Sequence, residues 1–498
     1  MPRSRWSSVT YVGMFLLTLV LWLPFSFKTT GLMEEWGVIR IMETGSQLFF
    51  ITPNSPLDGH RMRPLEVFIH SLAHALDPDS FLFFNVFQLL LMFGKMAAVY
   101  WLVLQFLPGR RLLAFVSGAL FLVYPADRAL FTFRAIHIQV ALCSFLWAAC
   151  LLIVFIRRRI RTAWLPLPGA VLLLLFSLMT YQVALPLAML TPLTALAFVH
   201  WRDRRLWIAS AAGYGAIAVA LGYAYWALQA STGATYEMGL VAPASTAGDV
   251  FDAIGLAYER QVTGWATAWR GVGFYRPLEW AVIAGTLVFL ATGVWVARRE
   301  RDNEPGRPVS ARRYLMVAAA AGAIVLLGMA VFLTIPTDRR QGFRIYLLAM
   351  AGSAVVLSLL LFGISRLVRR LRDALFLMLA VPFVALGYTF ALQDHQFFVN
   401  NSLLQQQILQ DMVNGAPRLT KDSFVVFLDH TQAVEREYVF SYGLYLDAAV
   451  NYVYGDQTIR TGYCPLKSPS MVKITCTFEP SSLHISGQDV EATVLGID

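Results

Sequence analysis

Two adjacent carboxylates, Glu34 and Glu35, follow the first apolar segment of the chain, which covers residues 9–27. A carboxylate is costly to bury close to lipid, so acidic residues at a membrane boundary point to a functional role. In such a role a carboxylate takes up a proton or binds a cation. The alternative is that both are solvated charges at the start of a surface helix, where the helix dipole favours them.

Membrane spans are the elements that must position these carboxylates. The chain has 498 residues, of which 57% are hydrophobic and 14% charged, and its mean hydropathy is +0.58. This composition excludes a soluble enzyme. Since a run of about 20 apolar residues crosses a bilayer, we predict an α-helical polytopic membrane protein. About eleven transmembrane helices are expected, near residues 9–27, 80–106, 112–126, 136–156, 163–181, 183–200, 206–229, 277–297, 314–335, 344–363 and 374–392.

Arginine-rich loops alternate along the chain and predict its orientation. Arg3 and Arg5 precede the first span, and arginine clusters follow the second, fourth, sixth, eighth and tenth spans. Because basic loops stay in the cytoplasm, the N-terminus is predicted inside and the C-terminal domain outside. The excess of arginine over lysine indicates a bacterial genome, so we expect a multi-pass protein of the bacterial plasma membrane. The net charge of +9 belongs to these loops and indicates no nucleic-acid partner.

Two domains are predicted, a membrane domain at residues 1–392 and a soluble outer α/β domain at residues 393–498. The first outer loop, residues 28–79, has amphipathic patterns at 34–44 and 64–76 that favour two helices on the membrane surface. The second, residues 230–276, has a predicted helix near 249–269. In the tail we expect helices at 401–413 and 437–453 and strands at 423–428, 472–478 and 491–494. Cys464 and Cys476 lie on the oxidising side, where we expect a disulfide.

Glu66, His70 and His74 recur at i, i+4 and i+8 in the second amphipathic segment. On a helix these side chains would share one face, and histidines spaced in this way can bind a metal. Three ligands on one short surface helix more often form a wetted polar stripe, and we favour that interpretation. A divalent metal is therefore a weak candidate, and no motif requires a cofactor.

The order of several motifs resembles that of a known family. Glu34-Glu35 follow the first span, Arg63-Pro64-Leu65 open a short helix, Asp77–Asn85 begin a long span, and Tyr124-Pro125 follow the third. This order, over about residues 1–200, is similar to that of the GT-C superfamily of integral-membrane glycosyltransferases, and closest to its members that resemble protein mannosyltransferases.

The resemblance implies transfer of a sugar from a polyprenyl-phosphate carrier to an acceptor on the outer face, with inversion. An inverting transfer needs a carboxylate that takes the proton of the acceptor hydroxyl. Glu34 matches the family's first acid and is the expected base, and Glu35 would bind a metal or hold an arginine. The lipid phosphate that leaves needs cations, and the candidates are Arg61, Arg63, Arg134, Arg339, Arg340 and Arg344.

The chain departs from the family pattern at two places. Glu34 stands where aspartate is usual, and Tyr181-Gln182 stand where many relatives have a Lys-Glu pair. Two other functions are therefore weighed. A transporter or flippase of lipid-linked glycans would also need outer arginines but no paired carboxylates, and the inverted repeats typical of transporters are not evident here. A non-catalytic membrane scaffold is the third possibility. The sugar and the acceptor are not identified by the sequence.

Overall fold

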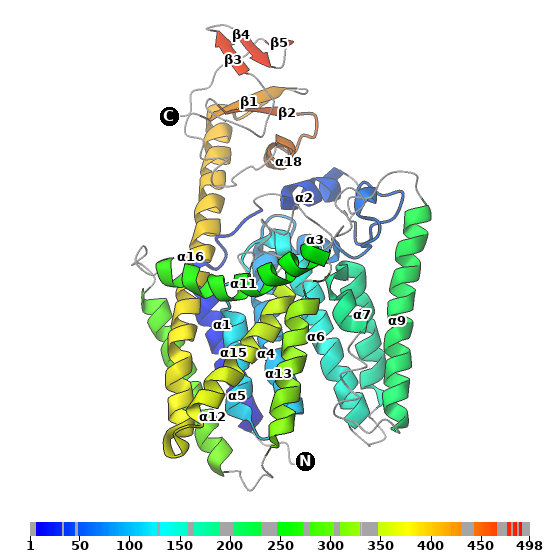
Figure 1. Cartoon of the computed structure of the whole chain (residues 1–498). Coiled ribbons are helices and arrows are strands. Elements are labelled where there is room, and N and C mark those ends of the chain that lie inside the picture. Colours follow the sequence, from blue (N-terminus) through cyan, green and yellow to red (C-terminus); the bar gives the residue numbers. More distant parts are fainter. Residues whose placement is uncertain are drawn as a thin grey trace.

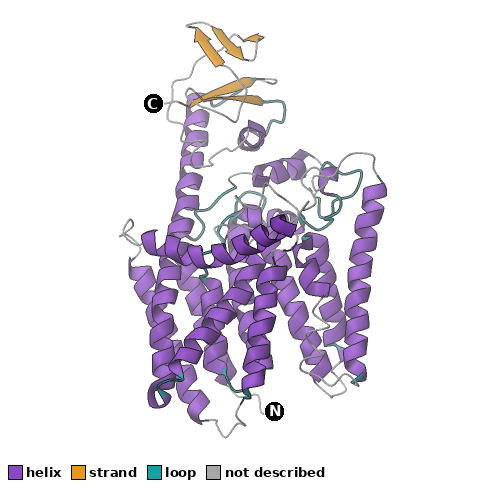
Figure 2. Cartoon of the chain, in the orientation of Figure 1, coloured by secondary structure: helices purple, strands orange, loops and turns teal. Residues whose placement is uncertain are grey.

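The structure is a computed structural model, and helices dominate its described part (Figure 2). Residues described are 6–31, 34–44, 48–126, 130–157, 164–189, 203–230, 247–271, 279–302, 309–328, 330, 347–419, 421, 423–429, 443–465, 476–479, 482–485 and 488–490.

Seven helices in this described part are long and apolar enough to cross a membrane. They are α1 (Trp6–Trp22), α4 (Leu82–Phe106), α6 (Ile136–Arg157), α9 (Arg204–Gln229), α12 (Glu279–Asp302), α15 (Leu347–Ser365) and α16 (Arg372–Gly415). Shorter helices at other predicted spans are α5 (Arg111–Leu122), α7 (Pro166–Thr180) and α13 (Ala311–Leu327). The span predicted at 183–200 lies mostly outside the described residues. The prediction of a helical polytopic membrane protein is confirmed.

Helix α5 forms the centre of the bundle. All its side chains from Leu112 to Leu122 are buried, and α1, α4, α12, α15 and α16 pack around it. At 12 residues it is about 18 Å long, shorter than the roughly 30 Å hydrocarbon core of a bilayer. The close approach of α16 to the end of α5 depends on glycine. A Cβ atom on Gly387 of α16 would collide with the carbonyl oxygen of Val123. Small residues are common where membrane helices pack this closely.

Helix α16 runs without a break over 44 residues from the bundle into the C-terminal domain, which is named the outer domain for its predicted side of the membrane (Figure 1). The span predicted at 374–392 and the helix predicted at 401–413 are therefore parts of a single helix, and residue 392 lies inside it. Pro382 is accommodated within the helix, and the helix ends at Gly415, two residues before Pro417.

The outer domain has mixed α/β structure, as predicted. Strand β1 (Phe424–Asp429) pairs in parallel with β2 (Arg460–Pro465), and α18 (Gly443–Tyr454) lies between them in sequence. A second sheet is antiparallel in the order β3 (Cys476–Glu479), β4 (Ser482–Ile485), β5 (Gln488–Val490). The side chains of Cys464 and Cys476 and the strand predicted at 491–494 lie outside the described residues, so the disulfide remains a prediction.

Three helices lie across the outer ends of the spans (Figure 1). Helix α2 (Glu34–Thr44) coincides with the first predicted surface helix, and α11 (Ala247–Gly271) with the helix predicted near 249–269. Helix α3 (Phe68–Leu76) begins four residues later than predicted, because residues 64–67 form turns. Helix α11 is held to the Tyr124-Pro125 loop, since the Tyr124 hydroxyl donates to the Gln261 carbonyl oxygen at 3.1 Å.

Candidate functional site

Helix α2 presents the paired carboxylates in its first turn. The helix begins at Glu34, whose side chain is outside the described residues, and the side chain of Glu35 is only 2% exposed. A buried carboxylate is tolerated only beside a positive charge or several hydrogen-bond donors. Glu35 therefore belongs to an enclosed polar site at the outer end of the bundle, and it is not a solvated surface charge.

The apolar row of α2 faces the outer domain. Trp36, Ile39 and Met42 are buried in one hydrophobic cluster with Leu409 and Met412 of α16 and with four residues of α18, Leu446, Ala448, Ala449 and Val450. The Trp36 indole nitrogen also donates to the Gln405 amide oxygen at 3.2 Å. The interpretation of this row as a membrane-facing surface is wrong, because protein covers it. Helix α2 is thus held between the spans and the outer domain.

Truncating Trp36 should loosen this attachment. We expect Trp36→Ala to cost about 3–5 kcal/mol, the range for a large aromatic residue removed from a core. Hydrogen–deuterium exchange should rise in residues 34–44 and 443–454. Trp280→Ala is the control, because Trp280 is 54% exposed on α12. Unchanged exchange in both segments would show that the cluster does not hold α2 to the outer domain.

The segment that contains Arg61 and Arg63 lies against the end of α7. The backbone nitrogen of Leu65 donates to the Met179 carbonyl oxygen at 3.1 Å, and the Gln182 amide donates to the Met62 carbonyl oxygen at 2.8 Å. Gln182 follows Tyr181 at the end of α7, and its hydrogen bond positions the arginine-bearing segment.

The two arginines of this segment have different surroundings. Arg61 is fully buried, and its Nε donates to the Ala227 carbonyl oxygen of α9 at 2.9 Å. Arg61 also donates to the Asp58 carbonyl oxygen at 3.1 Å, so these contacts tie the loop to α9. The Arg63 guanidinium lies 4.6 Å from the centre of the Tyr181 ring and 3.5 Å from the Glu66 carboxylate. The side chains of Tyr181 and Glu66 thus hold the Arg63 guanidinium.

Glu66 is the centre of a buried charge cluster. Its carboxylate lies 3.1 Å from His60 Nδ1 and 3.5 Å from His137 Nε2 of α6, in addition to Arg63. Burial alone would raise the Glu66 pKa, but the hydrogen bond with His60 and the charges of Arg63 and His137 outweigh it and lower that pKa to about 2. Glu66 is therefore ionised at neutral pH and fixes the cations around it.

The three side chains of the weak metal candidate, Glu66, His70 and His74, do not converge. His74 Nε2 pairs with Glu43 of α2 at 2.9 Å, whereas Glu66 pairs with His60. His70 is buried, which lowers its pKa to about 4 and keeps it neutral. Among the residues that the structure describes, no three metal-binding side chains converge. The regular spacing fails because the helix starts at Phe68, so Glu66 is not on its face.

The remaining predicted arginines are only partly placed. Arg134 lies in the short helix η3 (Phe133–Ala135), which contacts α2, although its side chain is outside the described residues. Arg339, Arg340 and Arg344 also lie outside them. The structure therefore brings the backbone of Arg134 beside the helix that bears the carboxylates. It places Arg61 and Arg63 on the loop that precedes α3.

Sequence reasoning missed two residues of the charge cluster, His137 and Tyr181. His137 is in the first turn of a membrane span, and its ring centre is 5.4 Å from that of Tyr181. Polar residues within spans usually face the bundle interior, and this signal was available for His137. Tyr181 was noted only as part of the Tyr181-Gln182 pair, and its contact with Arg63 depends on how α7 ends.

Comparison with known proteins gives a distant likeness of fold. No family model matches the chain, and no curated protein sequence matches it. ArnT from Cupriavidus metallidurans bound to undecaprenyl phosphate matches with a TM-score of 0.41 and 13% identity, over 92% of this chain and 90% of that one. The apo state of the same protein matches with a TM-score of 0.43 and 13% identity, over 91% and 86%.

Proposed function

We propose that this chain is a membrane glycosyltransferase that moves a sugar from a polyprenyl-phosphate carrier to an acceptor on the outer face. The observation that carries the proposal is the placement of Glu34-Glu35. They begin a helix enclosed between the spans and the outer domain, and Glu35 is buried. Such a site keeps water from a reactive sugar and strengthens the effect of each charge.

The proposed reaction is a single displacement with inversion. The acceptor hydroxyl oxygen attacks the anomeric carbon, and its proton passes to Glu34. The bond between the anomeric carbon and the phosphate oxygen breaks, and its electron pair goes to the lipid phosphate. Adjacent helical residues point about 100° apart, so Glu35 has a separate role and holds a cation. Arginines near α2, with Arg134 first, would neutralise the charge that develops on the phosphate.

Replacing Arg134 should weaken use of the donor. A hydrogen bond to a charged group contributes about 1.5–3 kcal/mol, so kcat/KM for the donor should fall roughly 10–100-fold in Arg134→Gln. Both KM and kcat should change, because the same charge holds the ground state and the transition state. Arg270→Gln is the matched control, since Arg270 is exposed in the last turn of α11. Equal kinetics in the two variants would show that Arg134 does not bind the donor phosphate.

The function itself can be tested in purified, reconstituted protein. Vesicles are supplied with a polyprenyl-phosphate sugar labelled in the sugar, together with candidate acceptors from the envelope of the source cell. Transfer of label to an acceptor, with release of polyprenyl phosphate, supports the proposal. Movement of the intact labelled lipid between leaflets without transfer would indicate a flippase. If the label is neither transferred nor moved between leaflets with any of the acceptors and donor sugars, the result would favour the scaffold.

A further inference from the structure

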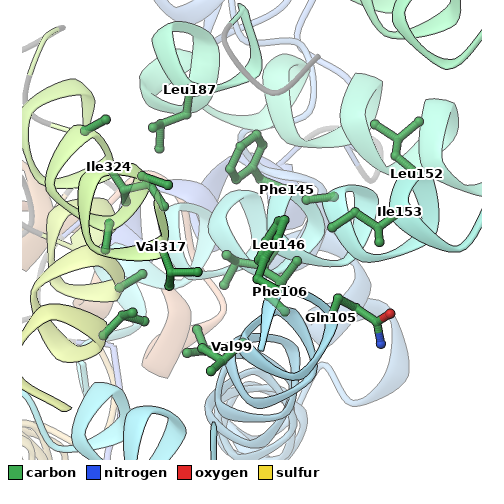
Figure 3. A pocket seen from close by; sticks show the side chains of 18 of the residues that line it. Val99, Gln105, Phe106, Phe145, Leu146, Leu152, Ile153, Leu187, Val317 and Ile324 are labelled. Atoms are coloured by element: carbon green, nitrogen blue, oxygen red, sulfur yellow. The ribbon is translucent and has the colours of Figure 1, made fainter. Parts of the chain in front are cut away.

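A cavity of about 200 Å³ lies between α4, α6, α9, α13 and α15, away from the carboxylate site (Figure 3). Its lining is apolar except for Gln105, Arg157 and Ser210. Gln105 is next to the end of α4, Arg157 ends α6, and α9 begins at Arg204, just before other lining residues. One end of the cavity therefore lies near the membrane face opposite the outer domain, which the arginine pattern predicts to be cytoplasmic.

Two cations stand at this end of the cavity. Arg157 donates to the Gln105 backbone oxygen at 2.6 Å and to its side-chain oxygen at 3.2 Å. Arg313, near the start of α13, interacts electrostatically with Arg157, and the two like charges repel each other. The arrangement leaves positive potential between α6 and α13.

The carboxylates described on the same face have other partners. Glu300 lies 3.5 Å from Arg110, and Asp373 lies 3.0 Å from Arg301 and 2.8 Å from Arg372. Asp203 accepts a hydrogen bond from the backbone nitrogen of Arg205 at 3.0 Å. Within the described residues, no ion pair involves Arg157 or Arg313. A positive site at the rim of an apolar cavity matches a molecule with an anionic head and an apolar tail.

We propose that the cavity binds one acyl chain of an anionic phospholipid from the cytoplasmic leaflet, with the lipid phosphate between Arg157 and Arg313. An apolar space between helices loses packing contacts unless a chain fills it. The surface of that leaflet is also where anionic lipids meet basic residues, at about 1 kcal/mol for each. This lipid site is separate from the proposed sugar transfer and does not depend on it.

Native mass spectrometry of the full chain tests the proposal with two probes, phosphatidylglycerol and phosphatidylcholine of identical acyl chains. We expect the chain to retain one phosphatidylglycerol molecule in preference to phosphatidylcholine. In Arg157→Gln/Arg313→Gln the preference should fall by roughly 30-fold, from about 1 kcal/mol for each charge. The control Arg312→Gln removes the neighbouring charge on α13 and should keep the preference. Equal binding of the two lipids by the unmodified chain would overturn the proposal.

A second pair of variants tests the cavity without changing charge. Ala320→Leu would fill the cavity, since Ala320 lines it, whereas Ala319 is exposed and outside the lining. We expect loss of the bound lipid in Ala320→Leu and retention in Ala319→Leu, with equal elution of both proteins on gel filtration. Retention of lipid in both would show that the chain lies elsewhere. One-for-one displacement of phosphatidylglycerol by undecaprenyl phosphate would assign the cavity to the carrier instead.

Discussion

Replacing Glu34 by glutamine is expected to lower the turnover of sugar transfer by roughly 10²–10⁴-fold, the usual contribution of a general base. Glutamine keeps the size of the side chain but cannot take the proton of the acceptor hydroxyl. The KM for the donor should change little, because the proton moves only in the transition state. Initial rates of label transfer at saturating donor, in reconstituted vesicles, give the comparison.

Two further variants locate the base. Glu35→Gln should affect donor binding or stability, because the buried Glu35 is assigned to a cation. Asp79→Asn is the control for loss of an outer carboxylate, since Asp79 is exposed. If Glu35→Gln loses turnover while Glu34→Gln keeps it, the base moves by one residue. Full activity in both glutamate variants would contradict the catalytic assignment and favour a flippase or scaffold.

Removing the charge of Glu66 should have the largest effect on stability. In Glu66→Gln the Arg63 guanidinium, whose side chain is only 14% exposed, would lose the charge of Glu66. Removing one partner of a buried ion pair costs about 3–5 kcal/mol. The lowered pKa of Glu66 gives a similar figure, since a fall from the ordinary 4.5 to about 2 corresponds to about 3 kcal/mol. The apparent melting temperature in detergent at pH 7 measures the loss.

The pH dependence of that loss has a definite sign. The pKa of Glu66 is lower in the folded chain, so its charge contributes fully above about pH 4.5. The contribution disappears as pH falls toward about 2. The difference in melting temperature should therefore shrink below pH 4.5. Asp58→Asn is the control, because Asp58 is half exposed and 3.9 Å from Arg61, and it should cost less than about 1 kcal/mol. A Glu66→Gln protein as stable as this control would show that the cluster is not stabilising.

Periodicity predicted the surface helices but not what covers them. The pattern of Trp36, Ile39 and Met42 located α2, because an amphipathic helix buries one face whatever its partner. Lipid and a protein domain are both apolar partners, so the sequence could not distinguish the membrane from α18. The arrangement depends on contacts with residues about 400 positions later in the chain.

Hydropathy predicted a membrane span in the first half of α16 but not where the helix ends. Gln393, Asp394 and His395 interrupt the apolar run, and this change in polarity suggested a domain boundary. Polar residues do not stop a helix, however, and the sequence from 393 to 412 contains neither proline nor glycine. The converse error occurred at Glu66, where a regular spacing was interpreted as helical although the turns at 64–67 precede the helix.

Because α16 is one long helix, it joins the outer domain rigidly to the bundle of membrane spans. At 1.5 Å per residue its 44 residues extend for about 66 Å, about twice the roughly 30 Å hydrocarbon thickness. A tilt of the helix by about 10° would displace the outer end by roughly 6 Å over the protruding half. Bilayer thickness, which changes helix tilt, would thus shift the outer domain sideways relative to the membrane spans. The lateral position of the outer domain would then vary with the lipid composition of the membrane.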